Sequence, residues 1–138
     1  MMNIRILLAD DHVIVRENLR RVLENEPDTQ VVAEATDGCE AVRLALESSP
    51  DVVLMDISMP NLDGIEAARQ ILRKAPDVKI LILSMYSDRR FVEQALKAGV
   101  SGYLLKNNAV SEVVNAIRTV VQGGSYISPK VSDVLVEN

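Results

Sequence analysis

The sequence lacks the features that secreted and membrane-spanning proteins need. Its 138 residues include a single cysteine, Cys39, so no disulfide can form within the chain and a reducing compartment is expected. No apolar run approaches the roughly 18–20 residues that span a bilayer. Asp10 and Asp11 interrupt the N-terminal apolar run before it could serve as a signal peptide. The sequence therefore predicts a cytoplasmic protein without a membrane segment.

The chain also lacks a net positive charge and has few aromatic residues. The net charge is −5, whereas surfaces that bind DNA or RNA are usually basic because they neutralise phosphates. We therefore expect no direct nucleic-acid binding by this chain. Aromatic residues make up 3% of the sequence and hydrophobic residues 48%, so the core must be aliphatic. The length suits one domain.

The sequence does contain an alternation of two hydrophobic patterns. Short runs rich in Val, Ile and Leu are typical of strands that are buried on both faces. They are Ile4–Ala9, Gln30–Ala35, Val52–Met55, Lys79–Ser84 and Gly102–Leu105. Between them, apolar residues recur every three or four positions, which predicts amphipathic helices. The predicted helices are Val13–Asn25, Gly38–Ser48, Gly64–Lys74, Arg89–Ala98 and Val110–Gln122.

Strands that alternate with helices predict an α/β fold, in which helices cover both faces of a parallel sheet. Right-handed crossovers favour a flavodoxin-like (βα)5 three-layer sandwich with a five-stranded sheet in the order 2-1-3-4-5. Residues 1–124 would form this domain. Residues 125–138 would form a linker or a short extra helix, because the apolar stripe of Val131, Val134 and Leu135 has no evident place in the core.

Chemically able side chains occur where the predicted strands end. Asp10 and Asp11 follow the first strand, and Asp56 follows the apolar run of the third. Ser84 ends the fourth strand, and Lys106 follows the fifth. Ligands of open parallel sheets bind beyond the carboxyl ends of the strands, at the point where the strand order reverses. We therefore expect these five side chains to share one pocket.

A phosphoryl-transfer site explains this combination better than separate structural roles do. Three carboxylates in one place repel one another, and a hard divalent cation such as Mg²⁺ relieves that repulsion. Asp56 could then act as both ligand and nucleophile. Lys106 would supply a second cation, and the Ser84 hydroxyl would donate to a phosphoryl oxygen. His12, the only histidine, is interpreted as a loop or helix-start residue.

These residues resemble the receiver domain of two-component response regulators. Pro50–Gly64 is very similar to the phosphoacceptor signature of that family. Four further segments resemble its NarL/FixJ (LuxR-type) branch, and the resemblance covers nearly the whole chain. They are Ile6–His12, Leu83–Tyr86, Ala98–Lys106 and Gly124–Pro129.

The resemblance implies a phosphorylation switch rather than an enzyme, since a receiver catalyses only its own phosphorylation and dephosphorylation. A sensor histidine kinase would phosphorylate Asp56 with Mg²⁺ as cofactor. Phosphorylation would then change a protein–protein surface. The expected partner at that surface is a second copy of the chain, in a homodimer that depends on phosphorylation. The output would be a helix-turn-helix transcription domain that follows the receiver in this branch and that these 138 residues do not contain.

The resemblance also assigns a role to each site residue. Asp11 and Asp56 would bind Mg²⁺ directly together with the backbone carbonyl of Ser58, and Asp10 would bind it mainly through water. Three further residues would respond to the phosphoryl group. Lys106 would form an ion pair with it, and Ser84 and Tyr103 would be the switch pair, in which the hydroxyl moves toward it as the ring turns inward.

One departure and two alternatives remain at this stage. Asn107 stands where many receivers have proline, so the isomer of the Lys106–Asn107 peptide bond is left open. A haloacid-dehalogenase-type phosphohydrolase would use similar groups, but it needs a second aspartate where this chain has Ser58. A receiver-like interaction module that is never phosphorylated is the other alternative, and the intact set of acidic, hydroxyl and lysine side chains argues against it.

Overall fold

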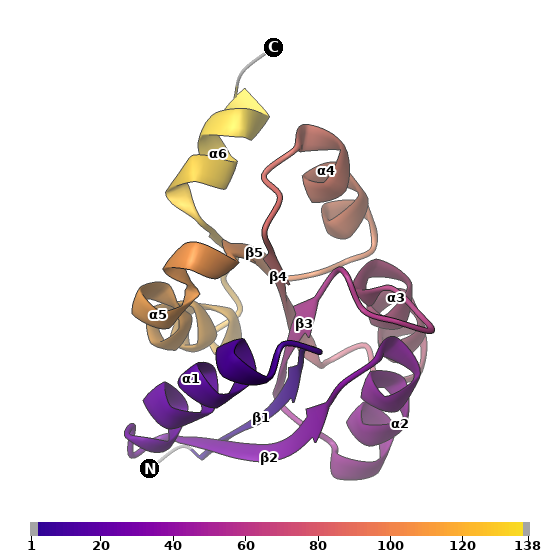
Figure 1. The fold of residues 1–138 in the computed structure, drawn as a ribbon, viewed down its shortest axis with the longest axis vertical. Helices are drawn as coiled ribbons and strands as arrows, with labels where there is room; N and C mark the ends of the chain where they lie inside the picture. Colours follow the sequence, from indigo (N-terminus) through magenta and orange to yellow (C-terminus); the bar gives the residue numbers. More distant parts are fainter. Residues whose placement is uncertain (1–2, 137–138) are drawn as a thin grey trace.

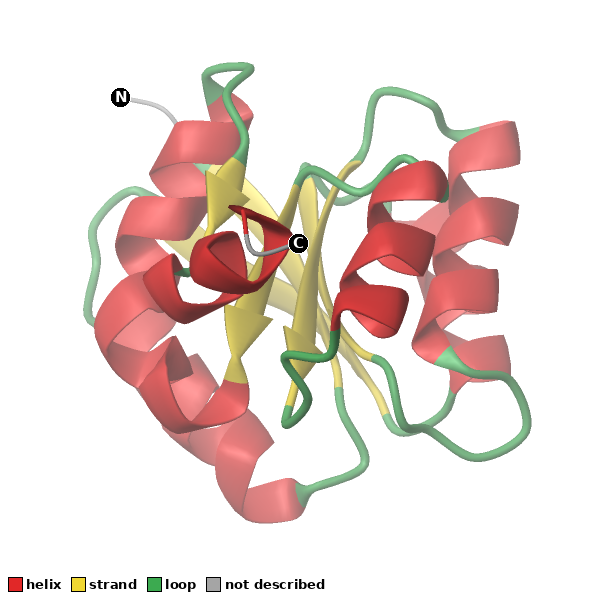
Figure 2. Cartoon of the chain, turned by 90° about the horizontal axis from the view of Figure 1, so that it is seen from above, coloured by secondary structure: helices red, strands yellow, loops and turns green. Residues whose placement is uncertain are grey.

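A parallel β-sheet forms the middle layer of the fold (Figure 2). The computed structural model describes residues 3–136, and the strands of its sheet lie in the order β2-β1-β3-β4-β5-β6. All neighbouring strands are parallel, and the order of the first five confirms the prediction. The strands are β1 Ile4–Ala9, β2 Thr29–Ala35, β3 Val52–Asp56, β4 Lys79–Ser84, β5 Gly102–Leu105 and β6 Tyr126–Ile127.

Helices cover both faces of the sheet, as the alternating pattern predicts (Figures 1 and 2). The helices are α1 Val13–Glu24, α2 Gly38–Ser48, α3 Gly64–Lys74, α4 Arg89–Lys97, α5 Ala109–Val121 and α6 Pro129–Val136, with a 3₁₀ turn at Lys106–Asn108. Within residues 3–136, no helix has both the length and the hydrophobicity needed to cross a bilayer.

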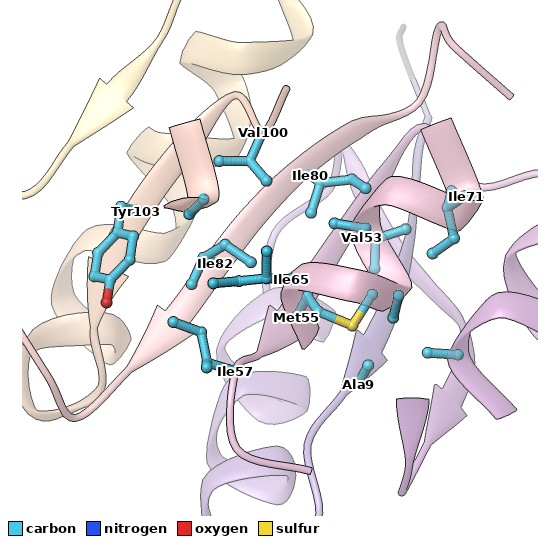
Figure 3. Close-up of a cluster of buried hydrophobic side chains, with 14 of the residues drawn as sticks. Ala9, Val53, Met55, Ile57, Ile65, Ile71, Ile80, Ile82, Val100 and Tyr103 are labelled. Atoms are coloured by element: carbon cyan, nitrogen blue, oxygen red, sulfur yellow. The ribbon is translucent and has the colours of Figure 1, made fainter. Parts of the chain in front are cut away.

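Each face of the sheet has its own hydrophobic core, because successive side chains of a strand point to opposite faces. Leu7 of β1 packs toward α2, α3 and α4, whereas Ile6 and Leu8 pack toward α1 and α5. Both cores are largely aliphatic, as the composition predicts. Tyr103 is the exception: its ring is fully buried at one end of the first core, beyond Ile82 (Figure 3).

The end of the chain differs from the expectation. The sheet has a sixth strand, because Tyr126 and Ile127 pair with Gly102 and Tyr103 of β5. Helix α6 then packs against α4 and β5 (Figure 1), and Val131 is fully buried in the first core. The expectation that the apolar stripe of α6 lies outside the core was therefore wrong. The predicted five-stranded sheet ended at β5, so it offered no surface at that edge on which a further helix could pack.

Polar contacts hold the start of this tail against α5 and β5. Glu112 of α5 accepts a hydrogen bond from the Tyr126 hydroxyl at 2.8 Å and one from the Ser128 hydroxyl at 3.3 Å. The Ser128 N–H also donates to the carbonyl of Tyr103 at 3.0 Å. Burial and the bond to Glu112 raise the pKa of Tyr126 to about 12, so its phenol stays a donor. The backbone of Tyr103 is thus bonded directly to the tail.

Shortening a buried side chain of α6 should therefore destabilise the whole domain. We expect Val131→Ala to lower the free energy of unfolding by about 1–2 kcal/mol, because it leaves a cavity beside α4. Val136 lies on the same helix with 80% of its surface exposed. Val136→Ala should change stability by less than about 0.5 kcal/mol. Urea unfolding of both variants measures the difference, and equal effects would mean that α6 is not part of the core.

Candidate functional site

The predicted site residues come together at one edge of the sheet. Asp10 follows β1, Asp56 is the last residue of β3, Ser84 ends β4 and Lys106 follows β5. Because these strands are parallel neighbours, their carboxyl ends lie side by side. All peptide bonds of the described chain are trans, so the Lys106–Asn107 bond, whose isomer the sequence left open, is trans.

Three aspartates form the acidic centre of the site. Asp10 and Asp56 are almost completely buried, with 1% and 2% of their surfaces exposed, and Asp11 lies beside them at the surface. One carboxylate oxygen of each aspartate and a ring nitrogen of His12 lie within 4.8 Å of one another. Such a group can hold a divalent cation.

Two buried oxygens in this cluster support a cation site. Asp10 Oδ2 and Asp56 Oδ2 accept no hydrogen bond from any residue between 3 and 136. A buried carboxylate oxygen that accepts no hydrogen bond is costly, and a bound cation would use its lone pairs. Carboxylate oxygens are the ligands that Mg²⁺ prefers, so the residues present fit that ion.

Lys106 is the positive charge closest to these oxygens. Its Nζ lies 3.0 Å from Asp56 Oδ2 and 3.1 Å from Asp10 Oδ2, and only 8% of its side chain is exposed. Both contacts are ion pairs without a hydrogen bond to either Oδ2. Asp10 Oδ1, by contrast, accepts a hydrogen bond from Nζ at 3.3 Å. One ammonium group therefore faces two buried carboxylates.

The surroundings of Asp56 make its carboxyl group harder to ionise than an ordinary aspartate. Burial, followed by the negative charge of Asp10, raises the pKa of Asp56 to about 6. Lys106 and the N–H of Ser58, which donates to Asp56 Oδ1 at 3.2 Å, act in the opposite direction but do not cancel the increase. Asp56 is thus a carboxylate whose charge the surrounding protein only partly compensates.

The loop that follows Asp56 is packed tightly against neighbouring backbone. Gly64, the first residue of α3, donates its N–H to the carbonyl of Ile57 at 2.9 Å. A Cβ at this position would lie 2.0 Å from the carbonyl oxygen of Asp56. Asp63 caps α3 by accepting hydrogen bonds from Ile65 and Glu66, both at 3.0 Å. The start of α3 therefore fixes the position of the Asp56 backbone.

Ser84 and Tyr103 both contact the backbone of Tyr86. The Ser84 hydroxyl accepts a hydrogen bond from the N–H of Tyr86 at 2.9 Å, and the Tyr103 hydroxyl donates to the carbonyl of Tyr86 at 2.7 Å. Both side chains are buried, and burial raises the pKa of the Tyr103 phenol. The backbone of Tyr86 therefore connects the two hydroxyls, and a movement of one of them would affect the other.

His12 is the residue of this site whose position the sequence interpretation missed. It is the helix-start residue that was expected, since it precedes α1, but its side chain makes no cap hydrogen bond. Instead its Nδ1 lies 2.9 Å from Asp10 Oδ1, 3.3 Å from Asp11 Oδ1 and 3.7 Å from Asp56 Oδ2. The sequence signal that could have placed His12 in the site is its position directly after the two aspartates.

The mouth of the site is apolar. His12, Val15, Met85, Lys106 and Asn107 line a hollow of about 380 Å³. Several large hydrophobic side chains on the elements that border this hollow are exposed. They are Val13, Ile14, Met85, Tyr86 and Val110, which come from the starts of α1 and α5 and from the segment after β4. Met85 lines the hollow itself with 73% of its surface exposed, and an exposed apolar side chain at a hollow is typical of an interaction site.

Comparison with known proteins agrees with this geometry. The family model of the response regulator receiver domain matches residues 6–118. The transcriptional regulatory protein DegU of Brevibacillus brevis is 46% identical over 134 residues, which covers 97% of this chain and 57% of DegU. The transcriptional regulatory protein LiaR of Bacillus subtilis is 46% identical over 129 residues, which covers 94% of this chain and 61% of LiaR.

A solved structure extends the likeness to the whole fold. The crystal structure of a LuxR-family two-component response regulator from Aurantimonas sp. SI85-9A1 has a TM-score of 0.92 and 42% identity, and covers 96% of this chain and 95% of that chain. These matches favour a receiver over the haloacid-dehalogenase-type phosphohydrolase. The chain belongs to the response regulator receiver family, in its NarL/FixJ (LuxR-type) branch.

Proposed function

We propose that Asp56 is the phosphoacceptor of this receiver and that Mg²⁺ is its cofactor. The observation that carries the proposal is the position of Lys106, whose Nζ lies about 3 Å from an oxygen of buried Asp10 and from an oxygen of buried Asp56. Neither of these two carboxylate oxygens accepts a hydrogen bond within the described chain. Asp11 and Asp56 would hold the ion directly, with the carbonyl of Ser58, and Asp10 mainly through water. Receivers are signalling switches rather than classical enzymes, which suits a site that modifies itself.

The chemistry follows from the same contacts. An oxygen of the Asp56 carboxylate attacks phosphorus, an acyl phosphate bond forms, and the leaving group of the donor departs with the electrons of the broken bond. When bound, Mg²⁺ neutralises charge on the phosphoryl oxygens. Lys106 moves from the Asp56 carboxylate to the new phosphoryl group, and the Ser84 hydroxyl donates a hydrogen bond to the same group.

The donor would be a sensor histidine kinase. The exposed apolar residues around the mouth, from α1, α5 and the segment after β4, support a protein donor, because a partner surface can cover them while its phosphohistidine approaches Asp56. A cytoplasmic location belongs to the same proposal. The relatives DegU and LiaR are named transcriptional regulatory proteins, and the chain spans 57% and 61% of their lengths. We infer that a helix-turn-helix output domain after residues 125–138 reads DNA as a phosphorylation-dependent dimer.

Labelling with a small phosphodonor tests the acceptor and the metal together. Acetyl phosphate with Mg²⁺ should add one phosphoryl group to the chain, measured by intact mass, and a chelator should prevent the addition. Asp63→Asn is a suitable control, because asparagine caps a helix as well as aspartate does, and it should be labelled like the parent. Failure of the parent to gain mass would favour the interaction module that is never phosphorylated. Labelling in the presence of the chelator would contradict the metal role.

The switch pair has a test of its own. Ser84→Ala should still be phosphorylated, but beryllofluoride should no longer change amide exchange across residues 84–106, because the hydroxyl that links the site to the Tyr86 backbone is gone. Thr119→Ala removes an exposed hydroxyl on α5 and should respond like the parent. Equal responses in Ser84→Ala and the parent would refute the coupling.

A further inference from the structure

The ring of His12 points one of its nitrogens toward the acidic cluster. Its Nδ1 is 2.9 Å from Asp10 Oδ1 and 3.3 Å from Asp11 Oδ1, and it is also 2.8 Å from the Nζ of Lys106. Half of the side chain, 51%, stays exposed, so the ring lies at the opening of the site. Neither the proposed phosphorylation nor the proposed Mg²⁺ site uses this nitrogen.

The neighbours of Nδ1 make conflicting demands on it. The Lys106 ammonium has only donors, so it needs a lone pair on Nδ1. An Asp10 carboxylate has only acceptors, so it needs a proton on the same atom. One nitrogen cannot meet both demands in either tautomer. A divalent cation accepts lone pairs from Nδ1 and from carboxylate oxygens together, and so satisfies the imidazole and the carboxylates at once.

The donor set then determines which ions suit the site. Carboxylates, carbonyls and water favour Mg²⁺, Ca²⁺ and Mn²⁺, whereas imidazole nitrogen favours later first-row ions such as Co²⁺, Ni²⁺ and Zn²⁺. The two buried Oδ2 atoms without hydrogen bonds are a separate sign that ligand atoms point into this space. Asp10, Asp11, Asp56 and His12 together offer a mixed oxygen and nitrogen set.

We propose that His12 is a direct ligand, through Nδ1, of the divalent cation in this site, and that it extends the ion specificity of the site from Mg²⁺ to ions such as Co²⁺. The inference rests on the cation site of the proposed function. Coordination also removes the contact between Nδ1 and Lys106, because one lone pair cannot serve both. The Lys106 ammonium then keeps only its carboxylate partners, from which it can reach a phosphoryl group on Asp56.

Titration calorimetry of the 138-residue chain without a histidine tag tests the specificity. His12→Asn should weaken Co²⁺ binding by about tenfold or more and change Mg²⁺ binding by less than about twofold, because the asparagine oxygen suits Mg²⁺ but is a weaker ligand for Co²⁺ than imidazole nitrogen is. Asparagine is also a good N-cap, so α1 should still form, which circular dichroism checks. Equal losses of Co²⁺ and Mg²⁺ binding, or no loss of either, would overturn the proposal.

Pulsed electron paramagnetic resonance tests the bond itself without any substitution. Mn²⁺ bound to the chain should show coupling to ¹⁴N, and ¹⁵N-histidine labelling should change that coupling, which identifies His12 because the sequence has one histidine. Absence of nitrogen coupling would overturn the proposal even if Mn²⁺ binds. Asp11→Ala distinguishes a failure of the cation site from a failure of the His12 ligand. If neither the parent nor Asp11→Ala binds metal, the cation site itself fails, and if only the parent binds but without nitrogen coupling, only the role of His12 fails.

Discussion

Replacing Asp56 by asparagine should abolish labelling by acetyl phosphate and, at the same time, stabilise the metal-free protein at neutral pH. The first effect follows because an amide oxygen is a poor nucleophile at phosphorus. The second follows because the buried carboxylate of Asp56 lies beside Asp10 and has one oxygen without a hydrogen bond. Function and stability therefore oppose each other at this residue.

The gain in stability should depend on pH in a defined direction. The pKa of Asp56 is about 6 in the folded chain and 3.8 is its ordinary value, so the folded state binds its proton more tightly. Between these values the parent loses stability as the pH rises, and above pH 6 the loss is complete. After allowance for screening by solvent, we expect Asp56→Asn to gain about 1–2 kcal/mol at pH 7 and almost nothing at pH 4.

Urea unfolding of the parent and Asp56→Asn in chelator, across pH 4 to 8, measures this difference. Other groups titrate in both proteins, so the difference isolates residue 56. Added Mg²⁺ should stabilise the parent more than the variant, because only the parent keeps all three carboxylates. A variant that is less stable than the parent at pH 7, or whose advantage grows as the pH falls, would contradict the electrostatic account.

Replacing Gly64 by alanine should be the most disruptive single-methyl change near the site. The new Cβ would lie 2.0 Å from the carbonyl oxygen of Asp56 and 2.8 Å from its carbon. Backbone atoms cannot rotate away as a side chain can, so either the end of β3 or the start of α3 must shift. We expect a loss of about 3 kcal/mol in the free energy of unfolding. Displacement of Asp56 should also slow phosphorylation by about tenfold or more.

Gly123→Ala provides the matched control. Gly123 has a φ of 93°, but no atom lies within 4 Å of its missing Cβ. This variant should lose about 1 kcal/mol through backbone strain and keep the parental labelling rate. Urea unfolding and a time course of acetyl phosphate labelling compare the three proteins. Parental stability or a parental labelling rate for Gly64→Ala would show that the helix start does not fix Asp56.

Much of the fold could be predicted because its signals are local. Runs such as Val52–Met55 show that a strand is buried on both faces, and the spacing of Ile65, Ala68 and Ile71 shows a helix with one buried face. Each predicted boundary lies within one residue of the observed one. The alternation of strands with helices predicted parallel pairing, which brought Asp56 and Lys106 to the same edge of the sheet.

The tail was harder to predict because its partners lie far away in the sequence. Tyr126 and Ile127 are too few to show a strand period, and they form one only because β5 has a free edge. Likewise the stripe that contains Val131 is too short to identify its own partner. Only the folded arrangement of α4 and β5 provides the surface that buries it.

The sequence by itself determined the fold class, the strand order and the set of polar residues that meet, because hydrophobic period and chain connectivity are properties of the chain alone. The tertiary structure decided the rest of the site. That His12 turns inward, that two carboxylate oxygens are left without hydrogen bonds, and that Asp56 has a raised pKa all depend on distances of a few ångströms between separate elements. Burial and Coulomb energies change steeply over such distances, and no spacing along the chain specifies them.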